Sequence, residues 1–203
     1  MRLLELFAGT GSVKKAVGHL FTEVVSIDIL PTYAPSEVSD ILSWDYTQYP
    51  PGYFHTIWAS PPCTEYSSLK SISGAVRNLA LADSIVERTI SIIQYFDPER
   101  FFIENPQTGM LKERPFMLGI PFVDVDYCMF SDWGYRKRTR IWTNVAFTDT
   151  LCNKACGNLI GRLHRMSCCQ GRSRGESNAH SSTKHEMWRI PPRLLVELFA
   201  APF

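Results

Sequence analysis

The chain has 203 residues, of which 45% are apolar and 20% charged, which is the composition of a folded globular domain and excludes a disordered chain. Its apolar runs are far shorter than the roughly 20 residues of a membrane-spanning helix, and its N-terminus lacks the apolar stretch of a signal peptide. We therefore expect a cytoplasmic or nuclear protein, not a secreted one, with no membrane partner. Its six cysteines are then expected to be thiols or metal ligands rather than disulfides.

The net charge of +1 hides an asymmetry along the chain. Residues 1–150 hold 13 Lys and Arg against 17 Asp and Glu, whereas residues 151–203 hold 8 against 3. An acidic body with a basic appendage favours a polyanionic partner that is bound mainly by one end. A solvated basic loop would have the same composition.

Strands and helices are predicted to alternate along the first 150 residues. Short apolar runs predict strands at residues 3–7, 24–28, 54–59 and 100–106. Apolar residues spaced three to four apart predict helices at residues 13–20 and 75–95. Alternating patterns at residues 123–128 and 139–143 indicate an antiparallel or edge pair. This order predicts an α/β domain with a mostly parallel sheet, an irregular region from about residue 150, and a short amphipathic helix at residues 193–200.

Four distinctive clusters follow the predicted strands, at the edge where sheets of this class bind ligands. Gly9 and Gly11 lie in a strand-to-helix turn and allow the backbone to approach a ligand closely, although a plain tight turn has the same glycines. Asp28 ends the next strand, from which an acid commonly accepts hydrogen bonds from ribose hydroxyls. Together they predict a nucleoside-bearing ligand, and the absence of a following Gly-Lys-Ser/Thr argues against a triphosphate.

The other two clusters carry a thiol and an acid. Cys63 follows two prolines that hold the turn rigid, so it is a candidate nucleophile; a buried structural cysteine is the alternative. Glu104 follows an apolar strand, where a carboxyl keeps its proton more readily and can act as an acid; a capping or salt-bridged Glu is the alternative.

A basic run leads into the last predicted strand. Alternation along that strand places Arg136, Arg138 and Arg140 on one face and Lys137 and Thr139 on the other. Binding of an anion or substrate and a solvated basic edge are both consistent with this pattern.

Taken together, the motifs resemble the cytosine-C5 DNA methyltransferases. The motifs are Glu-Leu-Phe-Ala-Gly-Thr-Gly at residues 5–11, Ser-Pro-Pro-Cys at 60–63, Phe-Ile-Glu-Asn-Pro at 102–106 and Arg-Thr-Arg at 138–140, in the family's order. The match covers roughly residues 1–145. It implies a Rossmann-like, S-adenosylmethionine-dependent fold, with helices on both faces of the sheet, in a small member with a reduced target-recognition region.

The resemblance also implies how S-adenosylmethionine would be bound. The cofactor would lie along residues 7–11, with Asp28 on the ribose. Asp40 and Ile41 resemble the acid and its neighbour after the third strand, which contact the adenine, and Leu81 resembles the leucine that packs on it. The implied cofactor-binding residues are Phe7, Gly9, Gly11, Ser12, Asp28, Asp40, Ile41 and Leu81.

For catalysis, the resemblance implies that a cytosine is flipped out of duplex DNA into the pocket. The Cys63 thiolate would add to C6 while protonated Glu104 holds N3 and the amino group. Arg140, with Arg138, would orient Cys63 and the base. C5 would then take the methyl group, and loss of the C5 proton would release Cys63.

The sequence departs from the family pattern in three places. Pro106 stands where Val is usual, and Arg136-Lys137 stands where a Gln commonly precedes the Arg-x-Arg strand. The chain is also short, so we expect residues 1–145 to be the catalytic domain, 146–188 a basic recognition region, and 189–203 a helix that packs back on the catalytic domain.

A short recognition region predicts few base contacts and a short or degenerate target, with phosphate contacts supplying much of the affinity. A companion protein could supply further specificity, and the same residues fit an enzyme of a restriction–modification pair. The candidate DNA-binding residues are Arg136, Arg162, Arg165, Arg172, Arg174 and Lys184.

Cys152, Cys156, His164 and Cys168 have the ligand types and number of a structural zinc knuckle. The region after residue 150 is poor in large apolar residues and needs another source of stability, which a bound metal commonly supplies. The alternative is uncoordinated thiols in a loop, since the spacing matches no well-known finger signature.

Two further functions remain to be weighed against DNA methylation. The first is the same chemistry on cytosine in RNA. The second is a non-catalytic DNA-binding accessory subunit, although the thiol, the acid and the glycine loop are all retained. Methylation of an amino group is disfavoured, because such enzymes typically have an aromatic residue where this chain has Cys63.

Overall fold

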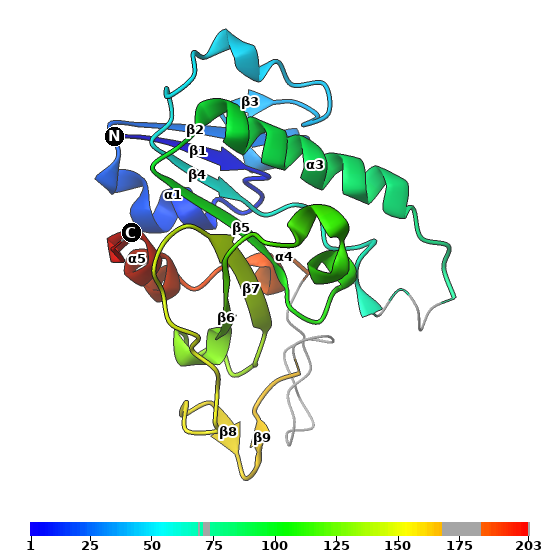
Figure 1. Cartoon of the computed structure of the whole chain (residues 1–203). Coiled ribbons are helices and arrows are strands. Elements are labelled where there is room, and N and C mark those ends of the chain that lie inside the picture. Colours follow the sequence, from blue (N-terminus) through cyan, green and yellow to red (C-terminus); the bar gives the residue numbers. More distant parts are fainter. Residues whose placement is uncertain (69, 71–73, 168–183, 203) are drawn as a thin grey trace.

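A seven-stranded sheet forms the centre of the molecule in the computed structural model, which describes residues 1–68, 70, 74–167 and 184–202 (Figure 1). The strands are β1 Arg2–Leu6, β2 Glu23–Asp28, β3 Glu37–Val38, β4 Thr56–Ala59, β5 Arg100–Pro106, β6 Phe122–Asp126 and β7 Arg138–Thr143. They lie in the order β3-β2-β1-β4-β5-β7-β6. The short strands β1 and β4 at the centre are mostly apolar, as expected for a sheet covered on both faces, although β1 also buries Glu5.

The first five strands run parallel, and β7 runs antiparallel to its neighbours β5 and β6. In the ladder between β6 and β7, Asp124 lies opposite Arg140 and Asp126 lies opposite Arg138. The predicted mostly parallel sheet and its antiparallel pair are therefore confirmed.

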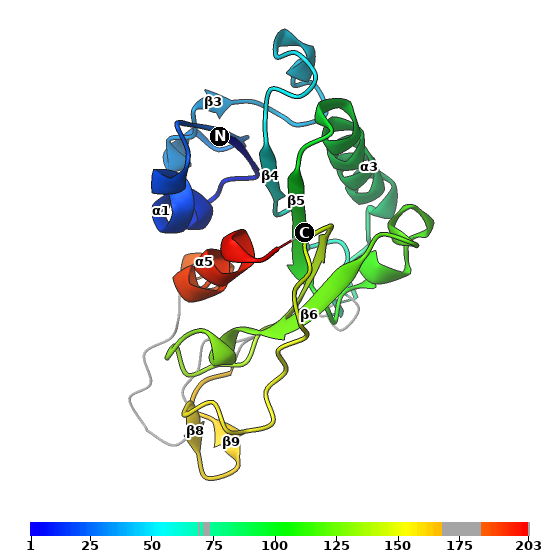
Figure 2. The same cartoon turned by 60° about the vertical axis from the view of Figure 1, so that its left-hand side comes forward.

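Helices cover both faces of the sheet. The helix α3 (Leu79–Phe96) lies on one face, and α1 (Ser12–Val17) and α5 (Pro192–Ala200) lie side by side on the other (Figure 1, Figure 2). Because side chains alternate along a strand, β1 sends Leu4 into the core beneath α3 and Leu3 into the core beneath α1 and α5.

The helices differ from their predicted bounds for local reasons. The helix predicted from residue 75 begins at Leu79, because the Asn78 side chain accepts a hydrogen bond from the Leu81 backbone N–H (3.1 Å) and caps it. The helix predicted over residues 13–20 stops at Val17, where Gly18 begins a 3-10 turn. A short helix, α4 (Lys184–Trp188), lies where no helix was predicted.

The helix predicted near the end of the chain is confirmed as α5. It begins after Pro191 and buries one apolar face, formed by Leu194, Leu195 and Leu198, against α1 and the sheet. The Phe199 ring stacks on Phe102 of β5, with ring centroids 5.0 Å apart. This packing places α5 on the same face of the sheet as α1.

A small hairpin of β8 (Leu159–Ile160) and β9 (Leu163–His164) lies beyond the far end of β6 and β7 (Figure 1, Figure 2). It is the only described sheet besides the main one. Among the described residues, no helix combines the length and apolar character needed to cross a membrane.

Candidate functional site

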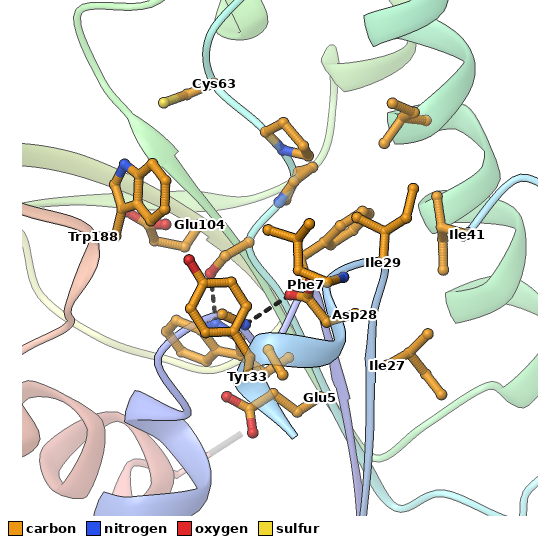
Figure 3. Close-up of a pocket in the computed structure, with 18 of the residues that line it drawn as sticks. Glu5, Phe7, Ile27, Asp28, Ile29, Tyr33, Ile41, Cys63, Glu104 and Trp188 are labelled. Carbon is orange, nitrogen blue, oxygen red and sulfur yellow. Dashed lines mark hydrogen bonds between the residues drawn. The ribbon is translucent and has the colours of Figure 1, made fainter. Parts of the chain in front are cut away.

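A cavity of about 490 Å³ opens at the carboxyl ends of β1, β2, β4 and β5 (Figure 3). It is bordered by the glycine loop after β1, the Pro-Pro-Cys turn after β4 and the acid on β5. The predicted site residues that line it are Phe7, Gly9, Ser12, Asp28, Asp40, Ile41, Cys63, Leu81 and Glu104. The structure therefore brings the clusters after the strands to one place.

The glycine loop is fixed by Asp28. One carboxylate oxygen accepts a hydrogen bond from the Gly9 backbone N–H (2.8 Å), and the other accepts one from the Leu30 backbone N–H (2.8 Å). Phe7, Gly9 and Gly11 all have positive φ angles, of 60°, 49° and 69°. This left-handed backbone turns the chain sharply before α1, with Gly11 at the N-cap of the helix rather than in the cavity wall.

Apolar side chains form the wall beside Asp28. Figure 3 shows Phe7, Ile29 and Ile41 on the same side of the cavity as the Asp28 carboxylate. Leu81 of α3 also lines this wall and is 46% exposed. Asp40 is exposed, and its carboxylate accepts a hydrogen bond from the Leu42 backbone N–H (3.0 Å). An acid at the edge of an apolar wall fits a nucleoside, whose base is apolar on its faces and whose sugar carries hydroxyls.

Glu5, which was not among the predicted site residues, lies beneath this loop and also lines the cavity. It is 2% exposed, and one of its carboxyl oxygens has no hydrogen-bond partner among the described atoms. Burial raises the pKa of Glu5 to about 7, although hydrogen bonds from the backbone of Lys14 and Val13 oppose the rise.

The thiol and the acid lie at the other end of the cavity. Figure 3 shows Cys63, Glu104 and Trp188 there. The Asn105 side chain donates a hydrogen bond to the Pro61 carbonyl oxygen (2.8 Å), which ties the Pro-Pro-Cys turn to β5. The neighbours of the thiol and the acid in sequence therefore hold the two reactive groups in a fixed relation.

Glu104 is buried and has two partners in the structure. Its Oε1 accepts a hydrogen bond from the Tyr127 hydroxyl (3.1 Å) and lies 3.4 Å from the Lys137 Nζ. The Lys137 Nζ also lies 4.8 Å from the centre of the Tyr127 ring. Glu104 is thus held between a phenol and an ammonium group.

The same ammonium group acts on Cys63. Burial raises the pKa of the Cys63 thiol, the positive charge of Lys137 opposes that rise, and the negative charge of Glu104 adds to it. Among the described residues that line the cavity, Lys137 is the only Lys or Arg. The sequence analysis did not single it out as a site residue.

The structure does not bring Arg138 and Arg140 to the cavity. Arg138 forms a pair of hydrogen bonds to Asp126 (3.0 and 2.8 Å), and Arg140 forms a similar pair to Asp124 (2.8 Å each). The alternation along β7 explains this, because Glu104 lies opposite Ile141 and therefore on the face shared by Lys137. The arginines of β7 lie on the other face of the sheet, where each pairs with an acid of the neighbouring strand β6.

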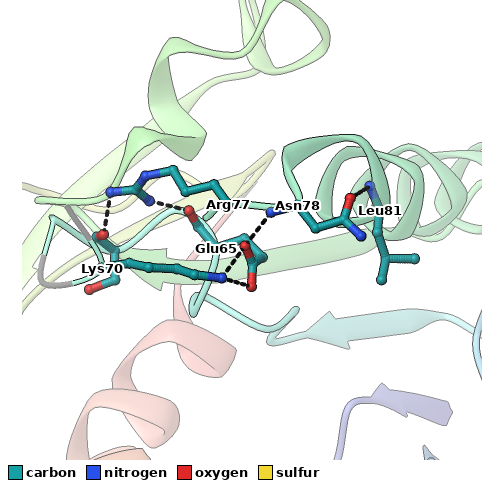
Figure 4. Close-up of polar contacts among 6 residues, drawn as sticks. Glu65, Lys70, Arg77, Asn78 and Leu81 are labelled. Atoms are coloured by element: carbon teal, nitrogen blue, oxygen red, sulfur yellow. Dashed lines mark hydrogen bonds and ion pairs between the residues drawn. The ribbon is translucent and has the colours of Figure 1, made fainter. Parts of the chain in front are cut away.

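A polar network joins the loop after Cys63 to the start of α3 (Figure 4). The Glu65 carboxylate accepts hydrogen bonds from the Asn78 backbone N–H (2.6 Å) and from the Lys70 ammonium group. The Arg77 guanidinium donates to the carbonyl oxygens of Glu65 and of Ser67, the latter at 2.7 Å. The hydrogen bond from Lys70 lowers the pKa of Glu65, so the Glu65 carboxylate remains charged at neutral pH.

Trp188 and Ile190 complete the cavity from the other end of the chain. The Ile190 backbone N–H donates a hydrogen bond to the Ser12 hydroxyl (3.2 Å), next to the glycine loop. Trp188 is 51% exposed and lines the cavity together with Glu104 (Figure 3). Sequence reasoning missed both residues, because no local pattern ties them to the loop.

The predicted DNA-binding residues have different surroundings. Arg136 is exposed before β7, and Arg162 is exposed in the turn of the β8–β9 hairpin. The Arg165 guanidinium donates hydrogen bonds to the Asp132 carbonyl oxygen (2.9 Å) and to the Asn158 side chain (3.0 Å), so it also holds the hairpin in place. Arg172 and Arg174 lie outside the described residues, as does the side chain of Lys184.

The predicted knuckle residues Cys152, Cys156 and His164 lie together in the structure. Their fourth neighbour is Cys128, in the 3-10 turn Tyr127–Met129 that follows β6. Cys168, the predicted fourth ligand, lies outside the described residues.

The chain is similar over almost its full length to a viral protein. "Probable DNA (cytosine-5)-methyltransferase" of Frog virus 3 (isolate Goorha) is 35% identical, and the match covers 98% of each chain. No family model matches the chain.

Solved structures with 14% and 16% identity share the fold. The S. pombe Dnmt2 methyltransferase matches 76% of this chain with a TM-score of 0.51, and the Entamoeba histolytica methyltransferase EhMeth matches 75% with a TM-score of 0.52. This chain spans 57% of each of those two chains. The predicted Rossmann-like methyltransferase fold is thereby confirmed.

Proposed function

Because the chain belongs to the DNA (cytosine-5)-methyltransferase family, we propose that it transfers a methyl group from S-adenosylmethionine to C5 of a cytosine in DNA. The observation that carries this proposal is one cavity with an anchored glycine loop at one end and a thiol, an acid and an ammonium group at the other. A methyl donor and a pyrimidine ring would meet between these two ends.

S-adenosylmethionine would be held by the residues of the glycine-loop end. The Asp28 carboxylate accepts hydrogen bonds on both oxygens from the backbone, which fixes it to receive the ribose hydroxyls. Ile41 and Leu81 would flank the adenine, with Asp40 at its edge. When bound, the sulfonium of this cofactor supplies an electrophilic methyl group.

The other end of the cavity would hold a cytosine that has left the duplex. The Cys63 thiolate would add to C6, and the electron pair of the C5–C6 double bond would move through C5 and C4 to N3, which takes a proton from protonated Glu104. C5 would then form a bond to the methyl carbon as N3 returns its proton to Glu104, and the electron pair of the broken sulfur–methyl bond would stay with the sulfur. Loss of the C5 proton to water would restore the double bond and expel the Cys63 thiolate.

Lys137 takes the part of the cation in this mechanism. It lies 3.4 Å from Glu104, and its charge opposes the burial that raises the pKa of Cys63. Lys137 therefore favours the thiolate and offsets negative charge that develops on the ring. Arg138 and Arg140 would act indirectly, by joining β7 to the acids of β6.

We also propose which residues bind DNA outside the cavity. Arg136 and Arg162 are exposed and available for phosphates, while the described hairpin has only two residues in each strand. A recognition region as short as residues 146–188 specifies few base pairs, which favours a short target or a partner protein that adds specificity. A metal at the Cys/His cluster would take no part in the transfer, because none of those four residues lines the cavity.

The decisive experiment is transfer of labelled methyl groups to mixed-sequence duplex DNA, followed by nucleoside analysis of the digested product. The proposal expects label in 5-methylcytosine with the wild type and none with Cys63→Ala. As a control, Cys63→Ala should bind S-adenosylmethionine as the wild type does, because the thiol lies at the far end of the cavity.

Other outcomes would redirect the proposal. Label in RNA but not in DNA would change the substrate and keep the chemistry. Transfer that survives in Cys63→Ala would overturn the covalent mechanism. Binding of DNA without binding of S-adenosylmethionine would favour a non-catalytic accessory subunit.

A further inference from the structure

Four potential metal ligands converge beside the β8–β9 hairpin. They are the thiols of Cys128, Cys152 and Cys156 and a ring nitrogen of His164, and their ligand atoms all lie within 4.8 Å of one another. The His164 Nε2 lies 3.6 Å from the Cys152 Sγ and 3.4 Å from the Cys156 Sγ. All four side chains are buried or half-buried, so the cluster lies inside a fold rather than on an open surface.

The two sulfur–nitrogen distances match the edges of a tetrahedron around zinc. With Zn–S bonds of about 2.3 Å and a Zn–N bond of about 2.0 Å, tetrahedral angles place sulfur and nitrogen about 3.5 Å apart. The two sulfur–nitrogen distances lie on either side of that value. Three thiols and one imidazole also form one of the usual closed ligand sets of structural zinc.

We propose that Cys128, Cys152, Cys156 and His164 bind one structural zinc ion. On binding, the three thiols lose their protons to solvent and the imidazole binds as the neutral ring. The site has no open position for a substrate, because four protein ligands complete the tetrahedron. This ligand set contains Cys128 in place of the Cys168 that the sequence pattern suggested.

Hydrogen bonds already orient two of the ligands, as is usual around metal sites. The Cys152 backbone N–H donates to the buried Asp126 carboxylate (2.8 Å), which also holds Arg138. The Lys154 backbone N–H points to the Cys152 Sγ (3.3 Å). The Asn158 side chain donates to the Cys128 carbonyl oxygen (2.9 Å), so the turn that carries Cys128 is fixed as well.

The ion would join three separate parts of the chain. Cys128 follows β6, Cys152 and Cys156 lie in the loop after β7, and His164 belongs to β9. The hairpin has two residues per strand and exposes Ile160 and Leu163, so it is too small to be stable by itself. Zinc would fix it to the end of the sheet and thereby position Arg162.

Elemental analysis of the full chain, purified without chelators or metal-affinity resin, tests the proposal. We expect about one zinc ion per chain, and a cobalt-substituted protein whose absorption spectrum shows tetrahedral coordination with thiolate ligands. Zinc below about a tenth of an ion per chain, in protein with reduced thiols that takes up none from solution, would overturn the proposal.

Variants distinguish the two possible ligand sets. Cys128→Ser and Cys156→Ser should each lose at least about ten-fold in zinc affinity, whereas Cys168→Ser should retain the ion. Because Cys128 is buried and its variant could misfold, Cys168→Ser provides the second measurement, and Cys156→Ser, a ligand in both sets, is the positive control for loss of zinc. Loss of zinc in Cys168→Ser would overturn the assignment of Cys128. These readouts require no methyl transfer, so failure of the zinc site and failure of the proposed activity are separable.

Discussion

Lys137 sets the charge around the thiol, although the sequence analysis assigned this role to Arg138 and Arg140, which follow it in the chain. Its Nζ lies 3.4 Å from Glu104, and its charge lowers the otherwise raised pKa of Cys63. We predict that Lys137→Met raises the pKa of Cys63 further, because burial and Glu104 then act without opposition. Alkylation of Cys63 by iodoacetamide, followed by mass spectrometry across pH, should be several-fold slower at neutral pH.

Two variants control this experiment. Lys137→Arg keeps the positive charge and should leave the pH profile near that of the wild type. Arg140→Met removes a charge that is paired with Asp124 outside the cavity, and it should leave the profile unchanged. A shift with Arg140→Met and none with Lys137→Met would return the role of the cation to Arg140.

Glu5 gives the fold a dependence on pH. Burial raises its pKa to about 7 in the folded chain, from an ordinary value of 4.5. The folded state therefore prefers the protonated form, and its stabilising contribution is complete below pH 4.5 and disappears as pH rises through 7. Ionisation in the unfolded chain is what favours unfolding over this range.

We predict that Glu5→Gln removes this dependence, since the amide keeps an acceptor for the backbone N–H groups of α1. Between pH 5 and pH 8.5, the free energy of unfolding of Glu5→Gln should rise relative to the wild type by about 2 kcal/mol. Urea unfolding at both pH values measures the difference. A constant difference between the two proteins would show that Glu5 does not titrate in this range.

At the scale of elements, α5 joins the end of the described chain to α1 and the sheet. Leu198 is completely buried in that contact, whereas Val196 on the same helix is 48% exposed. We predict that Leu198→Ala lowers the free energy of unfolding by about 2–5 kcal/mol, because it removes packed methyl groups and leaves a cavity.

Val196→Ala is the matched control on the same helix and should change stability by less than about 0.5 kcal/mol. Denaturant unfolding of the three proteins gives both values. An equal loss in the two variants would mean that burial of Leu198 against α1 does not govern the contribution of α5, since alanine raises the helix propensity at both positions.

The helices and strands could be predicted from the sequence, but their exact boundaries and the register between strands could not. Apolar runs and helical spacing gave the central strands, α3 and α5, because burial on a sheet imposes those periods. The alternation of Arg138 and Arg140 with Lys137 was also readable. Which of those faces meets Glu104 depends on the pairing of β5 with β7, and that register is a tertiary property.

At the scale of the whole molecule, the residues that sequence reasoning missed come from distant segments. Cys128 precedes Cys152 by 24 positions and lies in a turn after β6, so no short spacing marks it as a neighbour of His164. Trp188 and Ile190 line the cavity although they stand far along the chain from its other residues. Motifs locate a site when its residues follow strand ends, and they miss partners that only the folded chain brings near.

The hydrogen bond between Ser12 and Ile190 has a consequence for how the protein is made. A nascent chain that has emerged only as far as the main sheet already carries the glycine loop, the thiol and the acid, but lacks the wall formed by Trp188 and Ile190. Ligand affinity should therefore appear only after residues 188–190 have emerged, and a bound ligand would favour chains in which they have packed beside the glycine loop. In a cell, chains stalled or cut before residue 188 would compete poorly for the methyl donor.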